Sequence, residues 1–161
     1  MKVFSLAICI FIALAVNNSI NAQNPKLDKE LMLKMLNNTR KKGCNCGDKV
    51  MPPAPPLKWN NNLQKAAQLH SNDMYRRNYF DHKSPDGKSI PRTRLKRANY
   101  IWSWTAENIA MGQMSTREVV EGWLGSPSHC ENIMNANYKE VGGAVKGLYW
   151  TQVFGTQKTK K

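Results

Sequence analysis

Apolar residues recur at helical spacing through the first half of the chain. Asp28 is a suitable N-cap for a helix that runs to about Lys41, with apolar residues three and four positions apart, and Gly43 ends it. A second helix is predicted between about residues 60 and 78, and His70 lies on its apolar face. We therefore expect His70 to be a buried, hydrogen-bonded histidine of the core.

Shorter elements are predicted in the second half of the chain. A short basic helix is expected from about Pro91, and two more helices are expected to begin at Ser115 and at Ser126, where serine is a favourable cap. The chain then closes with an antiparallel hairpin of two strands, at residues 138–145 and 148–154. Helices early and strands late indicate an α+β layered domain.

The N-terminus has the pattern of a signal peptide. Met1 and Lys2 precede an almost wholly apolar run, residues 3–16, which is too short to span a bilayer. A polar stretch follows and ends at Ala22, a small residue suited to a cleavage position. We predict cleavage after Ala22; an uncleaved membrane anchor is the alternative.

The rest of the chain is predicted to form one domain. We expect a linker at residues 23–27, a single domain with a sizeable core at residues 28–155, and a basic tail at residues 156–161. No second long apolar run is present, so no transmembrane segment is expected after cleavage. These features predict a monomer that is secreted, either extracellular or periplasmic.

The chain is strongly basic, with a formal net charge of +13. Beyond the tail, the excess lies in Arg40, Lys41 and Lys42 and in a cluster of basic residues between Arg92 and Arg97 that includes Arg94. A basic surface favours anionic partners such as cell-wall polymers, acidic glycans and lipid headgroups. Nucleic acid is excluded by the lack of a nucleic-acid-binding motif and by export. A solvated basic surface with no dedicated partner is the alternative.

Three cysteines remain after the predicted cleavage: Cys44, Cys46 and Cys130. An exported protein meets an oxidising environment, so one disulfide is expected. A bridge between Cys44 and Cys46 would close a very small ring, which favours a long-range bridge from Cys46 to Cys130, with Cys44 as the alternative partner. Such a bridge adds roughly 3–5 kcal/mol of stability. A zinc site of three thiolates, completed by His129, is the rival interpretation. Residues 44–56, rich in proline, are expected to be a loop.

The three histidines of the chain lie in or beside polar segments. His82 lies in a predicted turn at residues 78–87, Glu107 in a segment expected to be a loop, and His129 just after Ser126 at a helix start. A carboxylate beside an imidazole favours the charged imidazolium. We expect these segments to converge on one site.

Five segments resemble the CAP superfamily, which contains cysteine-rich secretory proteins, insect venom antigens and plant pathogenesis-related proteins. They occur in the family's order, and the run from Trp123 to His129 resembles the compact bacterial branch. The segments are Leu57–Asn60 with Ala66–Met74, Asp81–Pro85, Ala106–Ala110, Val120–His129 and Tyr149–Gly155. The resemblance implies a three-layer α-β-α sandwich with a surface cleft.

The resemblance also implies which residues line that cleft. Animal members carry two histidines and two glutamates there, often able to hold a divalent metal. His82 matches the first histidine and Glu107 the first glutamate. Ser126 and Tyr149 lie near the positions of the second glutamate and the second histidine, and His129 is suggested for the vacated space. The cleft residues are therefore expected to be His82, Glu107, His129, Tyr149 and Ser126.

The predicted function is that of an exported, non-enzymatic binding module. Its cleft would bind a small lipid, a glycan or a partner protein, since sterol or fatty-acid binding and cell-wall association occur in relatives. No cofactor is required and no catalytic residue is assigned. The alternative is a metal-dependent hydrolase of the cell envelope, with zinc held by His82, Glu107 and His129. A third interpretation is a structural domain whose polar cleft only holds two loops together. A serine hydrolase is disfavoured because no nucleophile-elbow pattern surrounds the serines.

Overall fold

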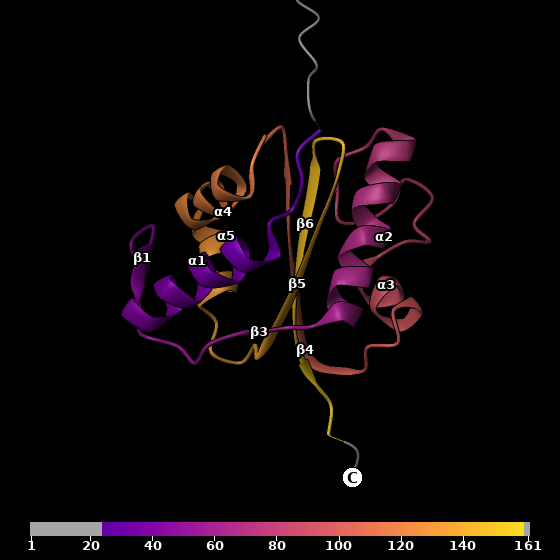
Figure 1. The fold of residues 1–161 in the computed structure, drawn as a ribbon. Helices are drawn as coiled ribbons and strands as arrows, with labels where there is room; N and C mark the ends of the chain where they lie inside the picture. The colour runs from indigo at the N-terminus through magenta and orange to yellow at the C-terminus, as the bar shows by residue number, and fades with distance from the viewer. Residues whose placement is uncertain (1–23, 160–161) are drawn as a thin grey trace, which may run out of the picture.

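The computed structural model describes residues 24–159, so the predicted signal peptide lies outside the described residues. A four-stranded sheet forms the centre, in the order β3-β5-β6-β4 (Figure 1). Strand β3 pairs parallel to β5, and the other neighbours pair antiparallel. The strands are β3 (Lys58–Trp59), β4 (Trp102–Met111), β5 (Glu140–Lys146) and β6 (Tyr149–Gln157).

Helices cover both faces of this sheet. Helices α1 (Lys29–Lys42), α4 (Thr116–Gly125) and α5 (Pro127–Met134) lie on one face, and α2 (Asn61–Arg77) and α3 (Pro91–Arg97) lie on the other (Figure 1). The predicted α-β-α sandwich and its closing hairpin of β5 and β6 are therefore confirmed. Among residues 24–159, no helix is long and apolar enough to cross a membrane.

Polar side chains begin the helices at the positions that the sequence indicates. Asp28 accepts a hydrogen bond from the backbone of Leu31 at the start of α1, and Asn60 accepts two at the start of α2. Ser115 accepts from the backbone of Glu118 and starts α4. These bonds satisfy N–H groups that a helix leaves free at its first turn.

The sheet separates two apolar cores of different character. The core on the α1, α4 and α5 side contains large aromatic side chains, among them Trp123, Trp150 and Phe154. The core on the α2 and α3 side is smaller and includes Ala66 and Ala67. Burial of each large side chain stabilises the fold by roughly 1.5–3 kcal/mol.

Close approach of α2 to the sheet depends on Gly142 in β5. A Cβ atom at this position would overlap the backbone of Leu63 and Gln64. The bare glycine therefore lets the first turns of α2 lie directly on the strand.

Two expected loops are strands. Within residues 44–56, β1 (Cys44–Cys46) and β2 (Lys49–Met51) form an antiparallel hairpin around Gly47, whose φ of 60° suits the turn. The segment of Glu107 is not a loop either, because it lies in the middle of β4, paired with β6. Glutamate and asparagine are uncommon in strands, and long-range pairing overrides that local preference. Strand β6 extends to Gln157, two residues into the predicted tail.

Candidate functional site

Strand β4 presents two polar side chains to opposite faces of the sheet. Successive side chains of a strand point to opposite sides. Glu107 contacts groups of the α2 and α3 layer, whereas Asn108 bonds to residues of α5 and β6. The residues of the predicted site therefore lie on both faces of the sheet, on either side of its edge strand β4.

Glu107 is held by two cationic partners. Arg94 donates from Nη2 to both carboxylate oxygens at 2.8 Å, and His82 Nδ1 lies 2.8 Å from Oε1. The side chains of Glu107 and Arg94 are only 4% and 1% exposed, whereas that of His82 is 49% exposed. The carboxylate is therefore sealed from solvent, and the imidazole that it orients is not.

His82 lies in the connection between α2 and α3. Asn78 ends α2 in the left-handed conformation. Further on, the Ser84 N–H donates to the Ser89 carbonyl at 2.8 Å. Arg94 donates to the His82 carbonyl at 3.0 Å, in addition to its bonds with the carboxylate. One buried guanidinium therefore positions both members of the His82–Glu107 pair.

The two members of this pair stabilise each other's charge. The hydrogen bond to Glu107 raises the pKa of His82, although partial burial and the charge of Arg94 act against this. Burial opposes ionisation of Glu107, but the bond from His82 and the charge of Arg94 outweigh it, so the pKa of Glu107 is lowered. These contacts favour the charged imidazolium on a ring that is half-exposed to solvent.

His70 approaches the same carboxylate from α2. Its Nε2 lies 3.6 Å from Glu107 Oε1, and its side chain is fully buried. Burial lowers the pKa of His70 to about 4, so the ring is neutral. The expected burial is observed, but the expected hydrogen bonds are not: within residues 24–159 neither ring nitrogen has a partner.

His129 lies on the other side of β4, on α5. Its Nδ1 is 3.0 Å from the hydroxyl of Ser126, and its carbonyl accepts from Asn108 at 3.2 Å. Partial burial lowers the pKa of His129, and the charge of His82 adds to this effect. The two imidazoles thus influence each other, although no hydrogen bond joins them in the described residues.

Tyr149 takes no part in this cluster. Its hydroxyl donates to Asn78 at 3.1 Å, and its ring meets Tyr75 edge-on. It lies at the start of β6, four residues before Val153, which pairs with Glu107. Four residues of strand span about 13 Å. Of the expected cleft residues, His82 and Glu107 bond directly, Ser126 and His129 form a second pair, and Tyr149 is separate.

Comparison with known proteins identifies the family. The model of the cysteine-rich secretory protein family, CAP, matches residues 33–154. The chain belongs to the CAP family. The Bacillus subtilis protein YkwD is 42% identical over 101 residues, which are 62% of this chain and 39% of YkwD. The B. subtilis membrane protein YlbC is 35% identical over 98 residues, which are 61% of this chain and 28% of YlbC. The chain thus spans well under half of these relatives.

Solved structures agree with the fold. An extracellular protein with an SCP domain from Bacillus anthracis has a TM-score of 0.70 and 27% identity, over 80% of this chain and 40% of that one. An outer surface protein of Borrelia burgdorferi has a TM-score of 0.65 and 23% identity, over 84% of this chain and all of that one.

The zinc set of His82, Glu107 and His129 fits this geometry poorly. Both Glu107 oxygens already accept from Arg94, and a metal ion there would face a buried guanidinium. A metal ion that took the carboxylate from Arg94 would leave a buried, unpaired guanidinium, which is costly. The three cysteines are also not a thiolate set here, because Cys46 and Cys130 form a disulfide.

Two arginines assigned to the basic surface are in fact buried. Arg94 and Arg40 are 1% and 0% exposed. Arg94 is thus a site residue that the sequence analysis missed, since its neighbours Arg92, Lys96 and Arg97 are exposed and look alike in sequence. A buried glutamate needs a cation, but the sequence does not show which one.

The guanidinium of Arg40 donates its hydrogen bonds to backbone carbonyls. Burial lowers its pKa to about 10, which leaves it charged at neutral pH. Its hydrogen bonds, at 2.6 to 3.2 Å, go to the carbonyls of Pro55, Ile133, Asn135 and Tyr138. This guanidinium ties α1 to the residues around the end of α5.

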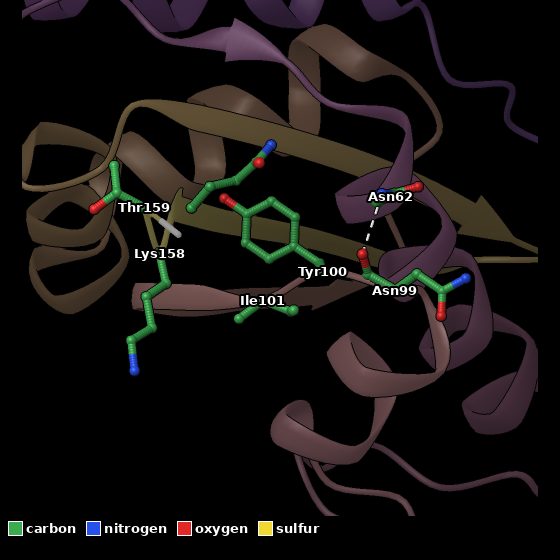
Figure 2. Close-up of a pocket in the computed structure, with 7 residues that line it drawn as sticks. Asn62, Asn99, Tyr100, Ile101, Lys158 and Thr159 are labelled. Carbon is green, nitrogen blue, oxygen red and sulfur yellow. Dashed lines mark hydrogen bonds between the residues drawn. The ribbon is translucent and has the colours of Figure 1, made fainter. Parts of the chain in front are cut away.

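One hollow of the surface lies apart from the histidines. It has a volume of about 710 Å³ and opens where the C-terminal end of β6 meets the start of β4 (Figure 2). Asn62, Tyr100, Ile101 and Lys158 are among its lining residues. None of the expected site residues lines it, so size alone does not locate the chemistry of this CAP domain.

Proposed function

We propose that this CAP domain is an exported binding module that recognises an anionic glycan or cell-wall polymer through the surface around His82. The observation that carries the proposal is the half-exposed imidazole of His82, held by a sealed carboxylate. Its Nδ1 is occupied by Glu107, so Nε2 is the nitrogen available to a ligand. A charged N–H donor of this kind suits a carboxylate, phosphate or sulfate.

The basic character of the chain supports the same class of partner. Its formal net charge is +13, and basic surfaces concentrate anionic polymers. A lipid with an anionic headgroup or an acidic protein shares this chemistry. We favour the polymer because a positively charged surface with one oriented donor suits a repeating anionic chain. A lipid would in addition need a buried pocket for its acyl chain.

Catalysis is not part of the proposal. A general acid or base must come within hydrogen-bond reach of its substrate. Glu107 is sealed and both of its oxygens are taken by Arg94. His82 is half-exposed, and the carboxylate hydrogen-bonded to it is the committed Glu107, so the pair offers a substrate no free carboxylate of its own.

Binding to immobilised polymers tests the proposal. Purified protein is passed over polyglycerol phosphate, a sulfated glycan and neutral dextran, and is also mixed with anionic phospholipid vesicles. At about pH 6, where His82 is charged, we expect retention on the anionic polymers that weakens as salt is added. If the protein bound the vesicles and none of the polymers, the ligand would be an anionic lipid instead.

A charge-matched pair of variants separates site binding from net charge. His82→Gln and Lys65→Gln each remove one positive charge, and Lys65 is exposed on α2. We expect His82→Gln to weaken binding about 5- to 10-fold, as loss of one charged hydrogen bond does, and Lys65→Gln to change it less than about twofold. Equal losses in both variants would reduce the interaction to non-specific charge.

A further inference from the structure

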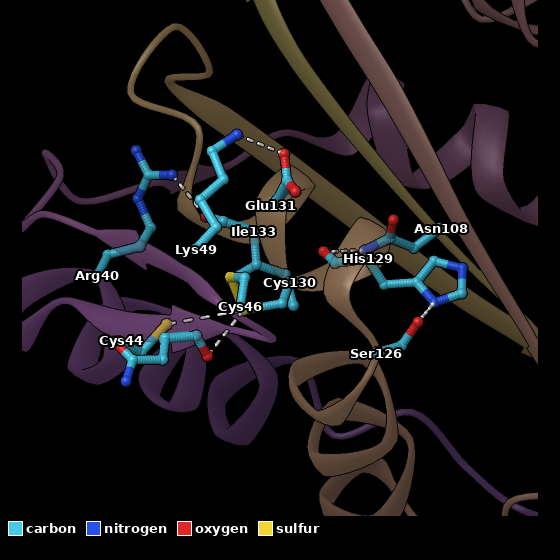
Figure 3. The surroundings of a disulfide bond; sticks show 11 residues. Arg40, Cys44, Cys46, Lys49, Asn108, Ser126, His129, Cys130, Glu131 and Ile133 are labelled. Carbon is cyan, nitrogen blue, oxygen red and sulfur yellow. Dashed lines mark hydrogen bonds and ion pairs between the residues drawn. A yellow bond between two sulfur atoms is a disulfide. The ribbon is translucent and has the colours of Figure 1, made fainter.

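Three sulfur atoms meet on the face of the sandwich opposite Glu107. Cys46 and Cys130 form a disulfide, and the thiol of Cys44 lies 3.7 Å from Cys130 Sγ (Figure 3). All three sulfurs lie within 4.8 Å of one another. A free thiol in van der Waals contact with a disulfide is the arrangement from which thiol–disulfide exchange begins.

The hairpin explains why the two cysteines of β1 share one target. Cys44 and Cys46 are two residues apart in a strand, so both side chains point to the same side. On that side lies Cys130 of α5. Either cysteine of β1 therefore faces the same sulfur.

Access differs sharply among the three sulfurs. Cys46 and Cys130 are 2% and 0% exposed, whereas Cys44 is partly exposed. A small thiol in solution cannot reach the disulfide without local opening of the fold, but it can reach Cys44. Cys44 is thus the one connection between the buried disulfide and solvent among the described cysteines.

We propose that Cys44 is an exchange site through which low-molecular-weight thiols and disulfides reach the buried bridge. The Cys44 thiolate attacks Cys130 Sγ and forms a new S–S bond. The Cys46–Cys130 bond breaks, its electron pair leaves on Cys46, and Cys46 then takes up a proton. No outside oxidant or reductant is consumed in this step.

The exchanged isomer carries a sulfur that solvent reaches. A thiolate from solution attacks Cys44 Sγ, forms a mixed disulfide with Cys44 and releases Cys130 as a thiolate. Cys130 is protonated, and the bridge is open. Burial raises the pKa of the Cys44 thiol, so the reactive thiolate is scarce and the Cys46–Cys130 pairing persists at neutral pH.

The test uses glutathione with glutathione disulfide at mildly alkaline pH, with a chelator present. Reaction is quenched with acid, free thiols are blocked with N-ethylmaleimide, and the pairing is read by tandem mass spectrometry. In the unaltered protein we expect glutathione on Cys44 and a fraction of Cys44–Cys130 disulfide. In Cys44→Ser we expect the bridge to open at least about tenfold more slowly, because opening then waits for local unfolding.

A second variant tests the alternative pairing directly. Cys46→Ser, folded under oxidising conditions, should form a Cys44–Cys130 disulfide and show no free thiol on residues 44 and 130. Equal opening rates in the unaltered protein and Cys44→Ser would overturn the proposal. So would purified protein that carries zinc on three reduced cysteines. This test is independent of binding at His82, because the two sites lie on opposite faces of the sheet.

Discussion

The two buried arginines show how differently the two helical layers use a buried charge. Arg40, on the α1, α4 and α5 side, bonds only to backbone carbonyls. Arg94, on the α2 and α3 side, bonds to a carboxylate that in turn bonds a half-exposed histidine. The hydrogen bonds of Arg40 stop at backbone groups, whereas those of Arg94 continue through Glu107 to the half-exposed ring of His82.

This difference matches the composition of the two cores. The Arg40 side has the larger aromatic core and the disulfide, and the buried cation there connects α1 with the end of α5. The Arg94 side has the smaller core and holds Glu107, His70 and His82 around its polar centre. Only on the Arg94 side does a chain of contacts lead from the buried arginine to a solvent-exposed side chain.

The largest expected effect comes from breaking the Arg94–Glu107 pair. Arg94→Met leaves a buried carboxylate without its main partner, and we expect a loss of about 3–5 kcal/mol in the free energy of unfolding. Urea denaturation measures it, and Arg92→Met, an exposed change on the same helix, is the control. The double variant Arg94→Met with Glu107→Leu should lose less than Arg94→Met alone; a larger loss would mean that the charges are not coupled.

Arg40→Met is expected to have the next largest effect. It removes a donor that four carbonyls share, although the Asn135 carbonyl keeps its bond from the Tyr138 N–H, and we expect a loss of about 2–4 kcal/mol. Its neighbour Lys41 is exposed, and Lys41→Met should stay within about 0.5 kcal/mol. Binding at about pH 6 should be unchanged in Arg40→Met wherever the protein is folded. If Arg40→Met folded normally but lost binding, Arg40 would also contribute to the binding site, and its purely structural role would be contradicted.

Acid should destabilise the protein through His70. Its folded pKa, about 4, lies below its unfolded value, so the neutral ring's contribution is present above about pH 6.5 and is lost as the pH falls toward 4. We expect a loss of about 2 kcal/mol between about pH 7 and pH 5. His70→Leu should flatten this part of the stability curve in denaturation across pH; an unchanged slope would assign the loss elsewhere.

His82 should act in the opposite direction and more weakly. Its pKa is raised by the bond to Glu107, so its contribution is complete below about pH 6.5 and is lost as the pH rises through the folded pKa. Because the ring is half exposed and screened, we expect less than about 1 kcal/mol. Nuclear magnetic resonance titration should show His82 titrating above, and His70 well below, an unstructured histidine. The reverse order would contradict the assigned contacts.

Much of the fold could be predicted from local patterns. Asp28 and Ser115 begin helices where capping rules place them, and the closing hairpin forms at the two strands that the sequence predicts. The pairing of Cys46 with Cys130 is also present. These features depend on nearby residues or on one strong chemical preference, and both are visible in a single sequence.

The amino-acid order alone therefore determined the helices, the layered fold and the His82–Glu107 pair, the last through family resemblance. Tertiary structure alone decided that Arg94 and not Arg92 meets Glu107, that His70 joins them, and that Cys44 touches the disulfide. Each of these depends on which side chains of distant segments are buried together. Burial is set by the packing of whole layers, and one basic residue or one thiol looks like another until that packing is known.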